Sequence, residues 1–584
     1  MSGRAKIPFA SGAPRVACVV ASSALSHHSI LAIFPRSTGA FMSVTAALVR
    51  PPVDVLHKFS KPVECLALGY LAAGLRARHH EAVLIDGMLY DWSVQKTADE
   101  IIQSKPDIVG FTVVLNHFPE QVEQISLLLR ESGFSGPIVV GGHAVSFYPD
   151  RILASAPVVD AVVCGEGELA LADIADAIAN GADWTATAGV VTRGGSGVVR
   201  RGVQRVTDVD LLGNPARDLT QAVIDNDGLA AMSTSRGCYA RCNFCSIPRF
   251  YGLERGGKGL ASGDWLGRPA DSMADEVLDL HERFGLLELL IVDDEFFGGS
   301  EVGFERAVEF GDRLSRAGAP AGLTISFRAE NARESVLTRL MEGGLQHCFI
   351  GLESGVDEDL KLYGKGQSAD QNAQAVRLVK KLGLSFQPGF MMFHYDSSIR
   401  QLRRNMEFLR SIGECKPVTV NSAVDPHFGA PITRVMNRAG VVDDHGTRMT
   451  MRYRDPRVHT VRRVAELAAD AFREYMNIIA TLQSAITYEW RRVVPGRDPE
   501  VARALDAFEA TVNDKFVRIV DESLDLVERE PELPAEEAMA WARERTEQVR
   551  TELRLPQSLL LMLLQRKEGE PRYWTQRELI DARR

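Results

Sequence analysis

The chain has 584 residues, of which 45% are hydrophobic and 25% are charged, and its formal net charge is −10. This length exceeds what one hydrophobic core supports, so we expect several domains. The acidic balance disfavours extensive nucleic-acid binding, and no apolar run reaches the ~18 residues that a membrane-spanning helix requires.

The first 14 residues are rich in Gly, Ser and Pro, and we expect them to be disordered. An apolar run at residues 16–24 follows two basic residues and resembles a short signal peptide. Pro14 interrupts that pattern, and the run fits a buried strand at residues 16–21 equally well. We favour the strand, because the pattern that follows needs one.

From about residue 15 to residue 180, short apolar runs alternate with amphipathic stretches. We predict buried parallel strands at residues 16–21, 82–85, 107–112, 138–140 and 161–164. We predict helices at residues 65–78, 94–104, 119–131 and 168–179. This alternation indicates a doubly wound α/β sheet of the Rossmann-like or flavodoxin-like kind, which binds ligands at the carboxyl ends of its strands.

The loops at those strand ends combine glycine with polar side chains, at residues 111–117, 141–143 and 165–168. Glycine lets the backbone approach a large flat ligand, and amide and hydroxyl groups supply directional hydrogen bonds. Taken alone, these loops fit a sheet domain without a ligand or a nucleotide-binding domain equally well.

A glycine-rich hairpin is expected at residues 189–199, and a proline-containing linker at residues 206–219. We therefore place a domain boundary near residue 205, so that the first folded domain spans residues 15–205.

The alternation then resumes as a second domain over residues 206–445. We predict its strands at residues 230–233, 287–292, 322–327, 348–352, 385–391 and 418–422. We predict its helices at residues 272–284, 301–317, 333–343, 368–382 and 399–412, the first of which begins with a capping box at Ser272. This pattern indicates a partial (β/α)6 TIM-like barrel, whose chemistry lies at the carboxyl ends of its strands.

Three of the eight cysteines follow the first barrel strand, at Cys238, Cys242 and Cys245. The C-x3-C-x2-C spacing puts three thiolates on one loop, where they can bind three irons of a [4Fe–4S] cluster and leave the fourth iron open. A structural zinc site is an alternative, but it needs four ligands, and no second Cys or His pair follows nearby. Cysteines used in this way fit a reducing cytoplasm rather than a disulfide framework. The remaining cysteines are expected to be small core residues: Cys18, Cys65, Cys164, Cys348 and Cys415.

Residues 446–584 are charged and helical in pattern. We predict helices at residues 462–491, 499–526 and 535–553, with breaks at Pro531 and Pro556. Their alternating charges indicate solvated helix faces. The aromatic residues of this region are expected to be packing residues: Tyr475, Tyr488, Trp490 and Trp574.

The cysteine loop, with Phe244 before the third cysteine, resembles the signature of the radical S-adenosylmethionine (radical SAM) superfamily. The resemblance implies that the amino and carboxylate groups of SAM chelate the open iron of a [4Fe–4S] cluster. Residues 351–355 are similar to the family's fourth-strand motif, in which a Glu-Ser pair lies beside SAM. Residues 389–396 and 427–431 depart from the family's usual sequences, which leaves substrate specificity open.

Polar residues at the barrel's strand ends are candidates for binding SAM. Acidic groups suit its ribose hydroxyls and amine, and arginine suits its carboxylate. For each residue, capping or solvating a strand end is the alternative. The expected SAM-binding residues are Phe244, Asp294, Arg328, Glu353 and Ser354.

The glycine loops ahead of the cysteine motif resemble, as a set, the cobalamin-binding domain of B12-dependent radical SAM enzymes over residues 60–180. The implied cobalamin-binding residues are Thr112, Leu115, Asn116, Gly141, Gly142, His143, Gly165 and Glu166. The Asp-x-His-x-x-Gly sequence, with which many B12 proteins offer a lower histidine ligand, is absent. We therefore expect no protein histidine on cobalt. The histidines weighed for that position are His27, His28, His57, His117 and His143.

The combined resemblance implies an enzyme, a B12-dependent radical SAM C-methyltransferase with a [4Fe–4S] cluster, SAM and cobalamin (methylcobalamin) as cofactors. It would methylate a carbon of a small-molecule or amino-acid-type substrate in natural-product biosynthesis. The tryptophan 2-C-methyltransferases of peptide-antibiotic pathways are similar in size and domain order, so C2 of tryptophan is one candidate.

Two alternatives stay open: a rearrangement or oxidation without methyl transfer, and a non-enzymatic cobalamin sensor. The expected partners are a small-molecule substrate and an external electron donor of the flavodoxin or ferredoxin type, with no nucleic acid and no membrane.

Overall fold

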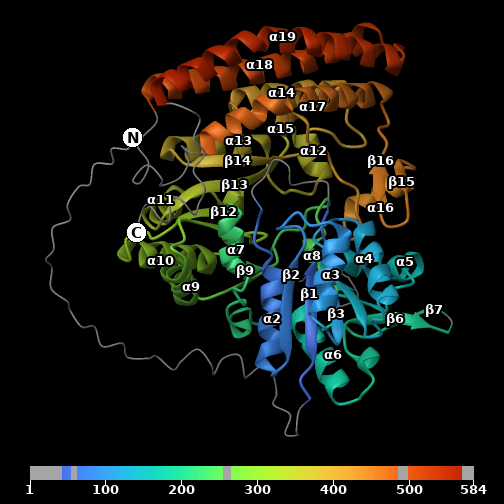
Figure 1. Cartoon of the computed structure of the whole chain (residues 1–584). Helices are drawn as coiled ribbons and strands as arrows, with labels where there is room; N and C mark the ends of the chain where they lie inside the picture. Colours follow the sequence, from blue (N-terminus) through green and yellow to red (C-terminus); the bar gives the residue numbers. More distant parts are fainter. Residues whose placement is uncertain (1–41, 54–61, 196, 254–264, 485–497, 569–584) are drawn as a thin grey trace, which may run out of the picture.

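Figure 1 shows the computed structural model of the chain, which describes residues 42–53, 62–195, 197–253, 265–484 and 498–568. Several sequence predictions lie outside these residues: the disordered residues 1–14, the strand at residues 16–21, Cys18, His27, His28, His57, Tyr488, Trp490 and Trp574. Within the described residues, no helix is both long enough and apolar enough to cross a membrane.

The N-terminal domain is built on a seven-stranded sheet of order β2-β1-β3-β4-β5-β6-β7. Its parallel strands are β1 (Thr45–Arg50), β2 (Glu81–Asp86), β3 (Ile108–Thr112), β4 (Ile138–Gly141) and β5 (Ala161–Val163). The predicted hairpin forms the antiparallel edge, with β6 (Val190–Gly194) and β7 (Gly197–Arg200). Strand β1 differs from the predicted strands, and its four-residue apolar run at positions 46–49 is fully buried between β2 and β3.

Helices cover both faces of this sheet, as a doubly wound fold requires. They are α2 (Leu66–Ala77), α3 (Val94–Gln103), α4 (Glu120–Glu131), α5 (Pro149–Ser155) and α6 (Gly167–Ala179), with short 3-10 turns η1 (Ala144–Phe147) and η2 (Trp184–Ala186). Leu48 of β1 packs with α2 and α6, whereas its neighbour Val49 packs with α3 and α4 on the opposite face. Successive strand residues point to opposite faces, so β1 contributes to two separate cores.

The second domain contains a five-stranded parallel sheet of order β14-β13-β12-β11-β8. The strands are β8 (Ala230–Met232), β11 (Glu288–Ile291), β12 (Gly322–Arg328), β13 (Leu345–Glu353) and β14 (Ser385–Phe390). The main helices between and after them are α9 (Ala270–Phe284), α10 (Glu301–Arg316), α11 (Glu334–Glu342), α13 (Ala369–Leu382) and α14 (Ile399–Ser411).

Shorter elements decorate this sheet. They are η3 (Asp210–Leu212), α7 (Thr220–Asp225), β9 (Ser235–Arg236), α8 (Ile247–Phe250), β10 (Leu266–Gly267), η5 (Ala329–Asn331), α12 (Asp357–Leu362), α15 (Pro417–Val420), α16 (Pro431–Arg438), β15 (Val442–Asp444) and β16 (Met449–Met451). The α/β fold class is confirmed for both domains.

Two local predictions in the barrel are wrong. The strand expected at residues 418–422 is the short helix α15, because Pro417 fits the first turn of a helix and has no N–H for a strand ladder. A single parallel bridge between Phe393 and Ala423 extends the sheet at that place. The capping box expected at Ser272 is absent, because α9 begins two residues earlier, and the Ser272 hydroxyl donates to Asp210 instead.

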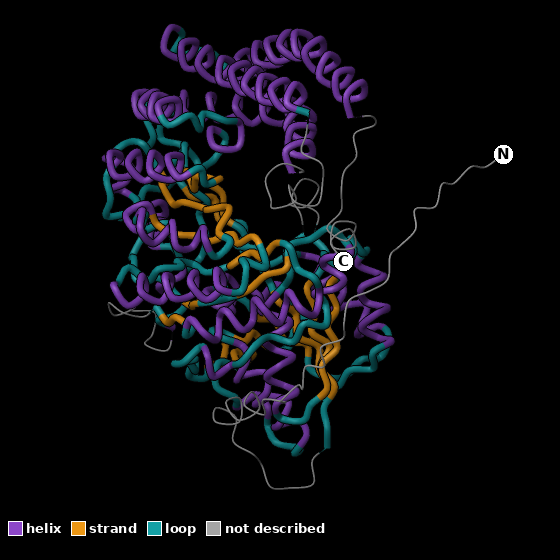
Figure 2. Tube along the Cα trace, turned by 90° about the vertical axis from the view of Figure 1, so that its left-hand side faces the viewer, coloured by secondary structure: helices purple, strands orange, loops and turns teal. Residues whose placement is uncertain are grey.

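Three long helices complete the fold: α17 (Pro456–Ser484), α18 (Pro499–Arg529) and α19 (Ala535–Glu568). They pack on one another, and α18 also contacts α14 and α15, so their apolar side chains continue the barrel's core. Figures 1 and 2 both show α18 and α19 at one end of the molecule. The break at Pro531 is confirmed, but the break at Pro556 is wrong, because that proline lies inside α19.

Candidate active site

The carboxyl ends of the two sheets share one cavity of about 650 Å³. The N-terminal domain lines it with α2 and the ends of β3, β4 and β5, and the barrel lines it with the ends of β8 and β11 and with α8. Of the predicted site residues, the lining contains Thr112, Gly141, Gly142, His143, Gly165, Glu166 and Asp294. Leu115 and Asn116 instead line a second cavity.

Glycine is required in the wall of this cavity. Gly142 has a φ of 127°, and a Cβ atom there would lie 2.4 Å from the carbonyl oxygen of Val113. Gly165 has a φ of 85°, and its Cβ atom would lie 2.5 Å from Val203 Cγ1. Both glycines therefore let their loops pack tightly against neighbouring protein. Both also line the cavity, where a broad, flat ligand such as cobalamin can approach the loops.

The start of the cysteine loop is held by the buried carboxylate of Asp293, which follows β11. Asp293 Oδ1 accepts hydrogen bonds from the backbone N–H groups of Thr234 (2.7 Å) and Ser235 (3.0 Å). Its Oδ2 accepts from the hydroxyl groups of the same two residues. One side chain thus fixes where the loop leaves β8.

The three cysteines of the loop are free thiols, as are all the described cysteines. Burial, followed by the charge of Glu295, raises the pKa of Cys238 to about 12. Burial, followed by the charge of Asp294, also raises the pKa of Cys245. Thiolates at these positions therefore need nearby positive charge, which the irons of a cluster would supply. The chemistry of these three donors on one loop fits a [4Fe–4S] cluster.

Among the described residues, no three His, Cys, Asp or Glu side chains converge to hold a single metal ion. A [4Fe–4S] cluster has a different requirement, because each thiolate binds its own iron and the sulfur atoms surround the cluster instead of meeting at one point. A structural zinc site differs in that it needs four ligands that converge on one ion.

Arg328, at the end of β12, connects the cysteine loop to the next strand end. Its Nη1 lies 3.0 Å from Cys242 Sγ, and its Nη2 donates to the carbonyl oxygen of Lys365. Lys365 Nζ in turn donates to Glu353 Oε1 at 2.9 Å. Glu353 ends β13 with a φ of 69°, a conformation that costs energy in a non-glycine residue and is concentrated at functional sites.

The other predicted SAM-binding residues lie apart from that group. The ring of Phe244 packs edge-on against Tyr363, with 5.8 Å between ring centroids. Ser354 is fully buried, and its hydroxyl is hydrogen-bonded to Asp359 and Asn405. The structure therefore places Ser354 beneath the Glu353 turn rather than in the wall of the cavity.

Asp294 faces the cavity. Its side chain is solvent-accessible there, and the protein around the carboxyl group, together with the charge of Asp293, raises its pKa to about 7. A carboxyl group in this state can accept or donate a hydrogen bond near neutral pH.

Arg236 joins the two halves of the site, and the sequence analysis missed it. Its Nη1 lies 2.6 Å from Glu166 Oε1, its Nη2 lies 2.5 Å from Glu168 Oε1, and its guanidinium group stacks over the ring of Tyr70. Glu166 is thus engaged by the cysteine loop. The sequence does show an arginine two positions before Cys238 and two glutamates in the loop at residues 165–168. That loop was expected only to bind cobalamin, so a contact between the two was not predicted.

His143 also bridges the domains. Its Nε2 lies 2.8 Å from the hydroxyl of Ser246, and its ring stacks on Phe250. Burial, followed by the charge of His427, lowers its pKa to about 4. His117 lines the second cavity.

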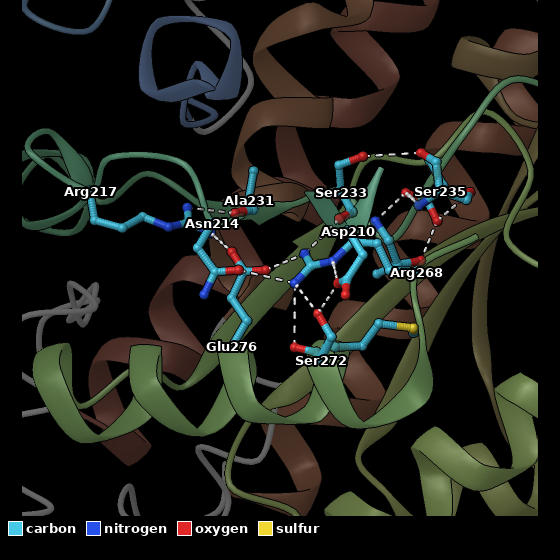
Figure 3. A network of polar contacts seen from close by, with 12 residues as sticks. Asp210, Asn214, Arg217, Ala231, Ser233, Ser235, Arg268, Ser272 and Glu276 are labelled. Atoms are coloured by element: carbon cyan, nitrogen blue, oxygen red, sulfur yellow. Dashed lines mark hydrogen bonds and ion pairs between the residues drawn. The ribbon is translucent and has the colours of Figure 1, made fainter. Parts of the chain in front are cut away.

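A buried polar network fixes the linker under the site (Figure 3). Arg217 lies between Glu64 (2.8 Å) and Glu276 (2.5 Å). Glu276 also pairs with Arg268, which hydrogen-bonds the backbone carbonyl of Ser233 beside the cysteine loop.

Two family models match the chain: the B12 binding domain at residues 52–175 and the Radical SAM superfamily at residues 232–409. An uncharacterized methyltransferase of Pyrococcus horikoshii is 29% identical over 354 residues, which is 59% of this chain and 73% of that protein. The 4'-phospho-dehydrooxetanocin synthase of Priestia megaterium is 26% identical over 67% of this chain, so the match spans about half (54%) of that synthase.

The solved structure of the cobalamin-dependent S-adenosylmethionine radical enzyme OxsB, with aqua-cobalamin and S-adenosylmethionine bound, has a TM-score of 0.72. The two sequences are 19% identical, and the superposition covers 92% of this chain and 84% of the OxsB chain. At this identity the similarity concerns the fold alone. The order of the two matched domains and their shared cavity agree with this fold. The chain therefore belongs to the cobalamin-dependent radical SAM enzymes, with a B12-binding domain followed by a radical SAM domain.

Proposed function

We propose that the chain is a methyltransferase that moves a methyl group from SAM, by way of cobalamin, to a carbon atom of a small-molecule substrate. The observation that carries the proposal is the single cavity that contains the glycine-bordered loops of one domain and the flanks of the cysteine loop of the other. A methyl carrier and a carbon-activating centre have to act on the same substrate atom, so they need such a shared space.

Cobalamin would be held by the loops after β3, β4 and β5, and it supplies a metal that carries a methyl group. Gly141, Gly142 and Gly165 admit the flat ring to the backbone, and Thr112 offers a hydroxyl group at the end of β3. Glu166 and His143 hold the cavity wall to the barrel. Leu115 and Asn116 continue the β3 loop toward the second cavity. The expectation that no protein histidine binds cobalt is kept as part of the proposal.

The cluster would be held by Cys238, Cys242 and Cys245, and it supplies electrons to SAM. Arg328, which lies against Cys242, would bind the SAM carboxylate, and Glu353 and Asp294 would bind its amine and ribose hydroxyls. Phe244 shapes the loop through its packing on Tyr363. Ser354 supports the Glu353 turn from below through its buried hydrogen bonds.

Reduction of the cluster requires an external electron donor, for which we propose a flavodoxin or ferredoxin. The free state of all described cysteines supports a reducing compartment, the cytoplasm, as the location. The proposal includes a biosynthetic role in natural-product formation, with C2 of tryptophan as the candidate methylated atom. Identification of the substrate tests both points.

A rearrangement or oxidation without methyl transfer is the second candidate, favoured by the Priestia megaterium relative, which is named a synthase. The two reactions differ in product mass. Methylation adds one methylene unit, whereas rearrangement yields an isomer and oxidation removes hydrogen.

The proposal is tested by anaerobic reconstitution of the full chain with iron, sulfide and cobalamin, followed by incubation with methyl-labelled SAM, a reductant and candidate substrates. We expect label in a product carbon, detected by mass spectrometry. A product without label would favour the second candidate, and failure to retain cobalamin would contradict both.

A further inference from the structure

A second cavity of about 500 Å³ lies beside the first. One wall is the loop after β3 at residues 115–117, and the other is formed by residues 423–426, the strand β16 and the start of α17. Residues 112–114 of the same β3 loop line the first cavity. A molecule in the second cavity therefore lies against the loop that borders the proposed cobalamin site.

The barrel side of this cavity is also at a strand end. Ala423 forms the parallel bridge that extends the barrel sheet beside Phe393, and residues 424–426 follow it directly. Asn116 Nδ2 donates to Asp425 Oδ2 at 2.9 Å, so the two walls are tied together. The cavity thus occupies the edge of the barrel where substrates of such folds bind.

Three arginines line this cavity in a chain whose net charge is −10. Arg462 is neutralised, because its Nη2 pairs with Glu466 at 2.9 Å and its Nη1 donates to Asn421. In the described part of the chain, the guanidinium groups of Arg448 and Arg463 have no ion-pair or hydrogen-bond partner. Both residues are solvent-exposed, so a ligand can reach them.

The remaining polar groups favour an anion over a cation. Asp425 and Glu466 are the acidic residues of the lining, and each already has a partner, Asn116 and Arg462 respectively. His117 and His459 have lowered pKa values, first through burial and then through Arg448 and Arg463 respectively. Neutral imidazole groups donate one N–H each, so they complement two guanidinium groups around an oxyanion.

We propose that Arg448 and Arg463 bind an anionic group of the substrate, a phosphate or a carboxylate on a small organic molecule. This inference rests on the proposed function and adds a substrate class to it. The anionic group occupies the second cavity, and the rest of the substrate follows the β3 loop toward the first cavity. Guanidinium groups suit this task because they bind both phosphate and carboxylate with two parallel hydrogen bonds.

Calorimetric titration of the full chain, loaded with cobalamin and cluster, tests this inference with inorganic pyrophosphate and with malonate as probes. We expect saturable one-to-one binding of at least one probe that weakens as salt is raised, because the two arginines are exposed. Arg448→Gln and Arg463→Gln should each weaken binding about tenfold, the effect of one lost charge-assisted hydrogen bond. Preference for pyrophosphate or for malonate distinguishes a phosphorylated substrate from a carboxylic acid.

Arg316→Gln is the matched control, because Arg316 is an exposed arginine on α10 outside both cavities. It should bind the probes like the wild type, and Arg448→Lys should retain part of the affinity. Equal binding by the wild type and by both glutamine variants would overturn the inference, and so would the absence of saturable binding by either probe.

The wild-type protein also separates this inference from the function on which it rests. Retained cobalamin and label transfer from SAM without anion binding would refute the inference alone. Anion binding by protein that retains no cobalamin would refute the proposed methyl transfer alone.

Discussion

At the scale of single residues, the site depends on a few side chains and glycines whose substitution would break specific contacts. Arg236 illustrates this, because its charge lies between two carboxylates of the other domain. An arginine in the motif and a Gly-Glu-Gly-Glu loop were both visible in the sequence, but their pairing was not. Such a contact depends on how two domains dock, which local patterns do not encode.

Gly142→Ala should abolish or strongly weaken cobalamin binding. The added Cβ atom would lie 2.4 Å from the Val113 carbonyl oxygen, and a φ of 127° is strained for alanine, so the loop that lines the cavity has to shift. We expect affinity to fall at least about tenfold, measured by equilibrium dialysis and by the visible absorption of bound cobalamin.

Gly202→Ala is the control for this change, because a Cβ atom there meets nothing within 4 Å and the residue lies outside the first cavity. Cobalamin retention by Gly142→Ala at the level of the control would remove the glycine wall from the proposed binding site.

At the scale of elements, strongly periodic segments were predictable from the sequence and context-dependent ones were not. Helix α14 was expected within one residue of its observed bounds, because its amphipathic pattern and its Ser398 capping box are local. Strand β1 was missed, because residues 16–21 offered a similar apolar run. Helix α15 differs from the predicted strand, because its β-branched residues Val418, Thr419 and Val420 favour a strand whereas Pro417 favours the first turn of a helix.

The candidate site follows the same division. The three cysteines and the glycine loops were predictable, because their patterns span only a few consecutive residues. The role of Ser354 was not, because its hydroxyl is hydrogen-bonded to Asp359 and Asn405, which lie outside the motif at residues 351–355. The arginines of the second cavity lie directly before β16 (Arg448) and in α17 (Arg462 and Arg463), a region in which the sequence indicated only solvated helices.

Asp293→Asn should loosen the cysteine loop and reduce cluster incorporation. Asp293 accepts four hydrogen bonds from Thr234 and Ser235, whereas an amide group replaces one acceptor oxygen by a donor. The buried NH2 group of the asparagine would face the N–H and hydroxyl donors of Thr234 and Ser235, which is unfavourable. We therefore expect the iron and sulfide content and the visible absorption of the cluster to fall by about half or more after anaerobic reconstitution.

The exposed Asp275 on α9 provides a control of the same type, and Asp275→Asn should leave cluster content unchanged. Full cluster content in Asp293→Asn would show that the loop does not need this anchor.

At the scale of the whole molecule, the two domains act as one unit through buried charges at the linker. Arg217 contacts Glu276 in the barrel helix α9 (Figure 3). It also contacts Glu64 ahead of α2, so it couples the domains that would hold the two cofactors. The helices α17, α18 and α19 extend the barrel's core at the far end, and the start of α17 closes the second cavity.

Arg217→Met should destabilise the protein by about 3–5 kcal/mol, because it leaves the buried carboxylate of Glu64 without its cation and takes one of two cations from the buried carboxylate of Glu276. A lowered midpoint of thermal unfolding and faster proteolysis at the linker would report this loss.

Arg76→Gln is the matched control, since Arg76 also joins α2 to the linker, through Asp218, but this pair is more than one third exposed. Exposed pairs contribute about 1 kcal/mol or less, so a similar loss of stability in both variants would contradict the coupling through Arg217.

The most direct test of the central claim, that one cavity serves methyl transfer by both cofactors, needs no substrate. The reconstituted full chain is incubated anaerobically with cobalamin, a reductant and methyl-labelled SAM, and the protein-bound cobalamin is recovered and measured by mass spectrometry. The account predicts that the wild type yields label in the cobalamin fraction and that Gly142→Ala yields little. Bound cobalamin that remains unlabelled in the wild type would contradict it.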